Sequence, residues 1–159
     1  MATQHNSLSY FNKEEIPNCK NLKIAIVVSQ WNQLITDKLK EGAEKTLIEC
    51  GLQKKNILVY HVPGSYELIF GARIAAKKSP NAIICLGSVI QGETKHFDFV
   101  CNAVSNGIKD LNIKLDTPVI FGVLTDNNIE QAKNRSGGKY GNKGVESAIT
   151  AIKMAILNK

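Results

Sequence analysis

Four short apolar runs, separated by longer amphipathic stretches, constrain the fold of this chain more than any other feature. Each run is rich in β-branched residues and is bounded by turn residues. This pattern is typical of strands that are buried on both faces of a sheet. The runs cover residues 23–29, 57–62, 82–90 and 118–124.

The stretches between and after the runs repeat apolar residues at a spacing of three to four, which predicts amphipathic helices. The expected helices cover residues 34–48, 68–76, 100–111, 129–135 and 145–156. Gly51 and Pro80 follow the first two helices as stop signals, and Thr125 or Asp126 is expected to cap the fourth. This alternation predicts an α/β protein, a three-layer α/β/α sandwich with a four-stranded, mainly parallel sheet of the flavodoxin-like type.

The length of 159 residues fits one domain, which we place over residues 23–159 behind an N-terminal arm over residues 1–22. The sequence has no apolar stretch long enough to span a membrane and no apolar signal core, which favours a cytoplasmic protein without membrane partners. The four cysteines lack C-x-x-C spacing and are expected to be reduced thiols.

The formal net charge of +6 could indicate nucleic-acid binding. However, the lysines are scattered along the expected helices, and no nucleic-acid motif is present. We therefore expect no nucleic-acid partner, but a solvated basic surface that attracts small phosphorylated molecules.

Ligands of parallel α/β sheets bind beyond the carboxyl ends of the strands, so the loops after the four runs are the places to search. The first loop carries Trp31, the only tryptophan, whose indole is either structural or a platform that stacks on a planar ring. In the second loop, Pro63 and Gly64 predict a turn, and Ser65 is expected to cap the next helix. This loop fits both a heterocycle-binding role and a plain strand-to-helix connection.

The third loop is the most informative. Gly92 allows the backbone to approach a ligand closely, and Thr94 supplies a hydroxyl at the start of a helix. The free N–H groups and the dipole at a helix start attract anions, phosphate above all. His96 lies in or beside the first turn, where it can exchange protons near neutral pH, although a structural role is the alternative. His5 in the arm and His61 inside an apolar run are poorer candidates.

Arg135 precedes a glycine-rich stretch over residues 136–144. The stretch matches neither G-x-x-x-x-G-K-[ST] nor G-x-G-x-x-G and follows a helix rather than a strand, which argues against a nucleotide-binding loop. A guanidinium held near tight turns suits a phosphate or a carboxylate, and a solvated charged surface is the alternative.

Other catalytic arrangements are missing from the sequence. Ser88 lies in Leu-Gly-Ser-Val-Ile, which lacks the second glycine of a nucleophile elbow. Cys101 lies five positions after His96, but no third residue is in place to orient the pair. No His, Cys, Asp or Glu cluster has metal-ligand spacing, so we expect neither a metal nor another cofactor.

Taken in order, six segments of the chain resemble the lumazine synthase (6,7-dimethyl-8-ribityllumazine synthase) family. The resemblance extends from about residue 23 to residue 158. Any one segment would be a weak match, but six in the same order are highly specific. They are Gln-Trp-Asn at 30–32, Val-Pro-Gly-Ser-Tyr-Glu at 62–67, Leu-Gly-Ser-Val-Ile-Gln-Gly-Glu-Thr at 86–94, His-Phe-Asp-Phe-Val at 96–100, Pro-Val-Ile-Phe-Gly-Val-Leu-Thr at 118–125 and Gly-Asn-Lys-Gly at 141–144.

The resemblance implies an enzyme of riboflavin biosynthesis. It would condense 5-amino-6-(D-ribitylamino)uracil with 3,4-dihydroxy-2-butanone 4-phosphate, with loss of phosphate and water, in the penultimate step of the pathway. An amine and a ketone form an imine without an activated nucleophile or a metal. Holding the two reactants in alignment can therefore supply most of the catalysis.

The resemblance also implies a role for each site residue. It makes His96 the proton carrier and predicts that Phe121 closes the pocket from a neighbouring subunit. The residues expected to bind the pyrimidine and its ribityl chain are Trp31, Ser65, Tyr66, Glu67, Ser88, Val89, Ile90, Phe121 and, with a supporting role, Lys143. The residues expected to bind the phosphate are Gly92, Glu93, Thr94 and Arg135.

Four positions, in three places, depart from the commonest family pattern. Trp31 stands where phenylalanine is frequent, and Ser65-Tyr66 stands where alanine-phenylalanine is common. Both changes keep an aromatic surface. Gln91 stands where arginine often occurs. This difference removes one positive charge near the phosphate, so Arg135 is expected to contribute more to phosphate binding.

The resemblance further implies a pentamer, or a hollow icosahedral shell of twelve pentamers (a 60-mer), together with an association with riboflavin synthase. The arm is expected to pair with the sheet edge of a neighbouring subunit. Two rival functions fit the same residues. One is a flavin- or nucleotide-binding module without catalysis, and the other is a shell protein that has lost its chemistry, against which the presence of both His96 and Arg135 argues.

Overall fold

The sheet of the protein has four parallel strands in the order β2-β1-β3-β4. The fold is taken from a computed structural model that describes residues 9–158. The strands are β1 (Ile24–Ser29), β2 (Ile57–Val62), β3 (Ala82–Ile90) and β4 (Val119–Asp126). The predicted fold class is confirmed, and β1 and β3 are the two central strands.

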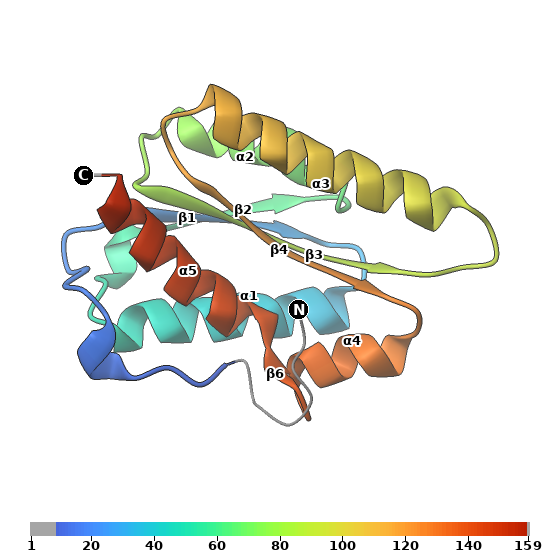
Figure 1. Cartoon of the computed structure of the whole chain (residues 1–159), viewed down its shortest axis with the longest axis horizontal. Helices are drawn as coiled ribbons and strands as arrows, with labels where there is room; N and C mark the ends of the chain where they lie inside the picture. The colour runs from blue at the N-terminus through green and yellow to red at the C-terminus, as the bar shows by residue number, and fades with distance from the viewer. Residues whose placement is uncertain (1–8, 159) are drawn as a thin grey trace.

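Helices cover both faces of the sheet, as Figure 1 shows. Helices α2 (Leu68–Ala76) and α3 (His96–Lys114) lie on one face. Helices α1 (Gln33–Glu49), α4 (Ile129–Arg135) and α5 (Lys143–Leu157) lie on the other. The remaining elements are short: the 3-10 turns η1 (Lys13–Glu15) and η2 (Lys54–Asn56), and an antiparallel hairpin of β5 (Ser136–Gly138) and β6 (Gly141–Asn142) between α4 and α5.

Alternate residues of each central strand pack into two separate hydrophobic cores, one on each face of the sheet. In β1, Ile24, Ile26 and Val28 pack toward α1 and α5, whereas Ala25 and Val27 pack toward α2 and α3. All five side chains are buried. Because both faces of these strands are covered, the strands read in sequence as continuous apolar runs rather than as alternating ones.

Two predicted helix caps are wrong. Neither Thr125 nor Asp126 caps α4, because β4 continues through both residues and pairs Asp126 with Ile90 of β3. The cap is Asn128, whose side-chain oxygen accepts a hydrogen bond from the Gln131 amide at 3.0 Å.

Ser65 does not cap α2 with its side chain either. The cap position lies two residues later, at Glu67, which makes no side-chain cap hydrogen bond, and the helix begins at Leu68. Helix α3 begins at His96, four residues before the first residue of the periodic pattern at position 100.

The described part of the arm contributes to the core on the α1 and α5 side. Cys19 and Leu22 are buried there, and Ile16 packs against the same core. The Ser9 hydroxyl meets the backbone of Asn142 at the start of α5. The boundary between arm and domain stays a prediction, and residues 1–8, including His5, lie outside the described residues.

All four cysteines are reduced thiols, as expected. Within residues 9–158, no helix is long and apolar enough to cross a membrane.

Candidate active site

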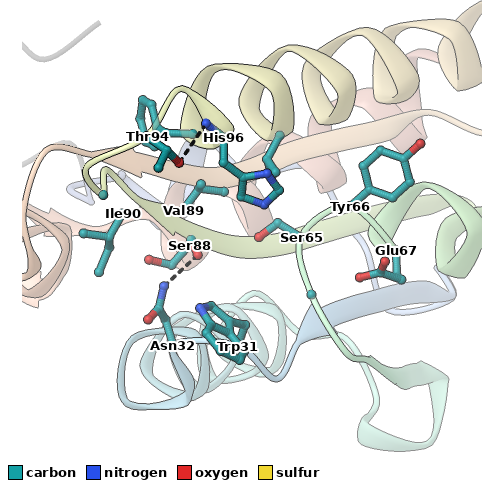
Figure 2. Close-up of a pocket in the computed structure, with 14 residues that line it drawn as sticks. Trp31, Asn32, Ser65, Tyr66, Glu67, Ser88, Val89, Ile90, Thr94 and His96 are labelled. Carbon is teal, nitrogen blue, oxygen red and sulfur yellow. Dashed lines mark hydrogen bonds between the residues drawn. The ribbon is translucent and has the colours of Figure 1, made fainter.

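A groove of about 550 Å³ opens at the carboxyl ends of β1, β2 and β3, where the sequence places the ligand loops (Figure 2). Ten of the predicted site residues line it: Trp31, Ser65, Tyr66, Glu67, Ser88, Val89, Ile90, Gly92, Thr94 and His96. Four further residues complete the lining, namely Asn32, Gly64, Phe97 and Val100. The sequence carried a signal for the last two, because Phe97 and Val100 are three positions apart and therefore share one face of the helix that starts at His96.

Trp31 presents its indole to the groove while its backbone is held in place. Its amide donates to the Pro63 carbonyl at 3.0 Å, and the Gln30 amide donates to the Val62 carbonyl at 2.8 Å. The next residue, Asn32, adopts a left-handed conformation with φ 59°, and its side-chain amide donates to the Ser88 carbonyl at 3.0 Å. The indole itself is 73% exposed. A fixed but exposed aromatic ring is well suited to stacking on a planar ligand.

Buried hydroxyl groups lie beside the indole. Ser65 is 6% exposed and Ser88 is 1% exposed, and neither hydroxyl has a hydrogen-bond partner within residues 9–158. Gly87 gives Ser65 its room, because a Cβ at position 87 would lie 2.7 Å from the Ser65 hydroxyl oxygen. A buried hydroxyl without a partner is unfavourable, so these groups are available to a polar ligand.

The start of α3 forms the opposite wall. Lys95 occupies the cap position without a side-chain hydrogen bond, and the Thr94 hydroxyl accepts from the His96 amide at 3.3 Å. Figure 2 shows the His96 ring extending from α3 toward Ser65, with Trp31 across the groove. This wall therefore combines an imidazole with the positive end of a helix dipole.

The space around Gly92 is open, since a Cβ added there would meet no atom within 4 Å. Glu93 lies in the same loop and is exposed, but it does not line the groove. The loop therefore presents backbone, rather than acidic side chains, to the groove.

Besides Glu93, three predicted site residues do not line the groove of their own chain. Phe121 and Lys143 border a separate hollow of about 370 Å³ between the β4 edge and α5. Arg135 belongs to the same region, because its guanidinium lies 2.9 Å from Glu146, a residue that also lines this hollow. We call Arg135, Lys143 and Glu146 the β4-edge charge cluster.

The β4-edge charge cluster is well ordered by its own contacts. Glu146 Oε2 lies 3.1 Å from the Lys143 ammonium, and Arg135 donates from Nη1 to the Tyr140 carbonyl at 2.9 Å. Arg135 and Glu146 are only 15% and 16% exposed. Glu146 was not predicted from sequence, although its position three residues after Lys143 on one helix places the two side chains together.

Gly144 fixes the position of this cluster relative to α1. A Cβ at Gly144 would overlap the carbonyl oxygen of Leu39, so only glycine allows the first turn of α5 to pack this closely. The Asn142 side chain caps the same turn by accepting from the Gly144 amide at 2.8 Å.

Comparison with known proteins decides which family these features belong to. Residues 21–159 match the family model described as 6,7-dimethyl-8-ribityllumazine synthase. The chain belongs to the lumazine synthase family. This confirms the family and the enzyme class that the six segments predict.

Curated lumazine synthases match along the whole chain. The 6,7-dimethyl-8-ribityllumazine synthase of Christiangramia forsetii is 58% identical over all of this chain and 96% of its own length. That of Flavobacterium johnsoniae is 53% identical over all of this chain and 84% of its own length. That of Porphyromonas gingivalis is 47% identical over all of this chain and 99% of its own length.

The ionisable groups of this lumazine synthase-family chain differ in how burial affects them. Burial raises the pKa of the Cys85 thiol to about 12, and burial together with the nearby Asp98 carboxylate raises the pKa of Cys101. A raised thiol pKa disfavours the nucleophilic thiolate. Burial also raises the pKa of Asp126, while the positive charge of Arg135 opposes that shift. Among the described residues, no group of three or more His, Cys, Asp or Glu side chains could hold a metal ion.

Proposed function

We propose that this chain condenses 5-amino-6-(D-ribitylamino)uracil with 3,4-dihydroxy-2-butanone 4-phosphate to give 6,7-dimethyl-8-ribityllumazine, the penultimate step of riboflavin biosynthesis. The observation that carries the proposal is the groove itself. It combines an exposed indole at Trp31, two unpartnered buried hydroxyls at Ser65 and Ser88, and His96 at a helix start. Family membership supports the same reaction.

The pyrimidine stacks on Trp31 and hydrogen-bonds to the two loops beside it. The planar ring fits an exposed aromatic face, and its ribityl hydroxyls fit hydroxyl and backbone partners. The residues that take part are those of 65–67 and 88–90. Two of them, Ser65 and Ser88, have hydroxyls without partners among the described residues.

The phosphate of the second substrate binds at the start of α3, where Gly92, Glu93 and Thr94 form the loop. The open space at Gly92 and the helix dipole support this placement. Arg135 supplies the positive charge that the loop lacks at Gln91.

His96 moves protons during imine formation, phosphate elimination and ring closure. Its ring reaches the middle of the groove, within reach of both proposed subsites. The amine nitrogen attacks the ketone carbon, and the carbonyl oxygen leaves as water, so each step needs proton transfer but no activated nucleophile. Alignment of the two reactants contributes most of the acceleration.

The complete site is shared between neighbouring subunits of a pentamer. Phe121, Lys143 and Arg135 lie at the β4 edge, away from the groove of their own chain. A neighbour that contributes this edge to the groove closes it and adds two cations. Twelve such pentamers can form a 60-mer shell that associates with riboflavin synthase, and the location is cytoplasmic.

The part of the N-terminal arm that precedes Ile16 pairs with the β2 edge of a neighbouring subunit in this assembly, since Ile16, Cys19 and Leu22 pack on the core of their own chain. Strand β2 is at the edge of the sheet, and Val59 in its middle is exposed. An unpaired edge of this kind favours the addition of a strand. Size-exclusion chromatography with light scattering tests the assembly, and a stable monomer would reject the shared site.

The decisive experiment mixes the two substrates with the purified protein and follows the fluorescence of the lumazine. A rate well above the spontaneous background, lost after heat denaturation of the protein, supports the enzyme. A protein that copurifies with a yellow ligand but gives only the background rate would instead be a flavin-binding module. Intact particles without ligand binding or turnover would indicate a shell protein.

A further inference from the structure

Asp126 lies between the loop after β3, residues 91–95, and the β4-edge charge cluster. It is the last residue of β4, and its carbonyl accepts a hydrogen bond from the Gln91 amide at 2.9 Å. This bond ties the loop that carries Gly92 to the end of β4. In Figure 1, α4 follows directly from this end of the strand, and Arg135 is the last residue of α4.

The side chain of Asp126 is poorly compensated. Its Oδ2 atom is buried and has no hydrogen-bond partner within residues 9–158. Burial raises the pKa of Asp126, and the charge of Arg135 lowers it by less than burial raises it. An ionised carboxylate is therefore less stable here than in water.

Arg135 is near two carboxylates but is in contact with only one. Glu146 Oε1 lies 2.9 Å from Nη2 as an ion pair, without the alignment of a hydrogen bond. Glu146 also has Lys143 as a second cation at 3.1 Å. The charge of Asp126 is therefore less well compensated than that of Glu146.

We propose that Asp126 is a positioning residue that weakens anion binding at Arg135 while it is ionised and takes up a proton when an anion binds there. The inference rests on the proposed phosphate-binding role of Arg135. With Asp126 ionised, the charges of Arg135, Lys143, Glu146 and Asp126 cancel, and a phosphate dianion meets no net positive charge. One solvent proton on Asp126 leaves a net charge of about +1, which favours the dianion.

Other groups around Asp126 also titrate or carry charge. Those on α4, on α5, on the loop after β3 and on the first turn of α3 include Glu130, Lys133, Arg135, Lys143, Glu146, Glu93, Lys95, His96 and Asp98. Protonation of His96 also favours an anion, so the pH dependence of the wild type alone does not isolate Asp126. The ratio between the wild type and an Asp126 variant does, because the other groups contribute to both proteins.

Sulfate is a suitable probe, because it keeps its double charge across the pH range that matters and needs no turnover. We expect Asp126→Asn to bind sulfate roughly five-fold more tightly than the wild type at pH 8, measured by titration calorimetry of the assembled protein. The advantage should shrink as the pH falls through the pKa of Asp126, because the protonated wild type then resembles the variant. Asp116→Asn is the matched control, since it removes one carboxylate at the opposite end of β4 and should change sulfate affinity little.

Asp126→Ser is a second neutral variant in case the asparagine does not assemble. Weaker sulfate binding in both neutral variants, or an affinity ratio that does not change with pH, would overturn the proposal. In steady-state assays, the KM for the keto-phosphate should fall in Asp126→Asn, while the KM for the pyrimidine stays within two-fold. If the affinity ratio between Asp126→Asn and the wild type changes with pH as expected but the wild type makes no lumazine, the proposed enzyme function is rejected and the Asp126 inference stands.

Discussion

The groove at the ends of β1 to β3 and the β4-edge charge cluster differ in whether their polar side chains have partners within the protein. In the groove, the hydroxyls of Ser65 and Ser88 are buried and have no hydrogen-bond partner in the described part of the chain, and the Trp31 indole is exposed. In the cluster, Arg135 and Lys143 are already paired with Glu146. The groove is therefore incomplete without a ligand, whereas the cluster is organised before the anion arrives.

This difference suits two different substrate groups. A neutral heterocycle gains most from unused hydrogen-bonding groups and an open aromatic face. A phosphate gains most from cations that are held in a fixed geometry, since their ordering is complete before binding. Variants of the two regions should therefore affect different substrates and different kinetic constants.

The largest effect is expected for His96→Ala. Removal of a general acid–base group should lower kcat by roughly a hundred-fold, while both KM values change less than about three-fold. Residual activity should remain measurable above the spontaneous rate, because alignment of the reactants survives. Complete inactivity of a correctly assembled variant would show that positioning is not the main source of catalysis.

Arg135→Ala should have the next largest effect. Loss of a charge-assisted phosphate contact should raise the KM for the keto-phosphate by roughly thirty-fold and leave the KM for the pyrimidine nearly unchanged. Arg135→Lys keeps the charge but not the planar fork and should fall in between. Equal increases for both substrates would contradict the division between the two regions.

Trp31→Ala should affect the KM for the pyrimidine rather than that for the keto-phosphate, and the increase should be smaller than for Arg135→Ala. Loss of the stacking surface should raise the KM for the pyrimidine by about ten-fold and leave the KM for the keto-phosphate nearly unchanged. Trp31→Phe retains an aromatic face and serves as the matched control, with an expected change of less than about three-fold. If the two substitutions at this position behave alike, stacking is not what Trp31 contributes.

The smallest effect is expected for the stability of Asp126→Asn. The pKa of Asp126 is higher in the folded protein than its ordinary value, so folding favours the protonated form. The stability from this group is present at low pH and is lost as the pH rises through the folded pKa. Asp126→Asn should therefore raise Tm by about 2 °C at pH 8 and leave it unchanged near pH 3.5, as measured by differential scanning calorimetry. A lower Tm at pH 8 would contradict the poor compensation of the carboxylate.

Most of the fold could be predicted from sequence because its strands are buried on both faces. The predicted strand over 57–62 has the observed bounds, and the predicted helices over 68–76 and 129–135 do too. The errors occur where pairing overrides local preference. Asp126 has the chemistry of a helix cap, but hydrogen bonds to β3 continue the strand through it, and the cap moves to Asn128.

The groove could also be foreseen, because loops that follow parallel strands must meet at one edge of the sheet. The location of Arg135 away from the groove could not be predicted from the sequence. The direction of the Arg135 side chain depends on how α4, the hairpin and α5 pack and on the contact with Glu146. No local sequence pattern encodes these tertiary contacts. The sequence likewise gave no sign that Ser65 would leave its helix uncapped and turn its hydroxyl into the groove.

The position of β4 at the outer margin of the sheet has a consequence for mixed assemblies. With the shared arrangement proposed above, every subunit offers its groove to one neighbour and its β4 edge to another, so defects in the two halves complement each other. Random equimolar coassembly of Trp31→Ala and Arg135→Ala chains would join an intact groove to an intact edge at about one junction in four. The two variants, denatured and refolded together, would then form lumazine faster at low substrate concentrations than either variant alone.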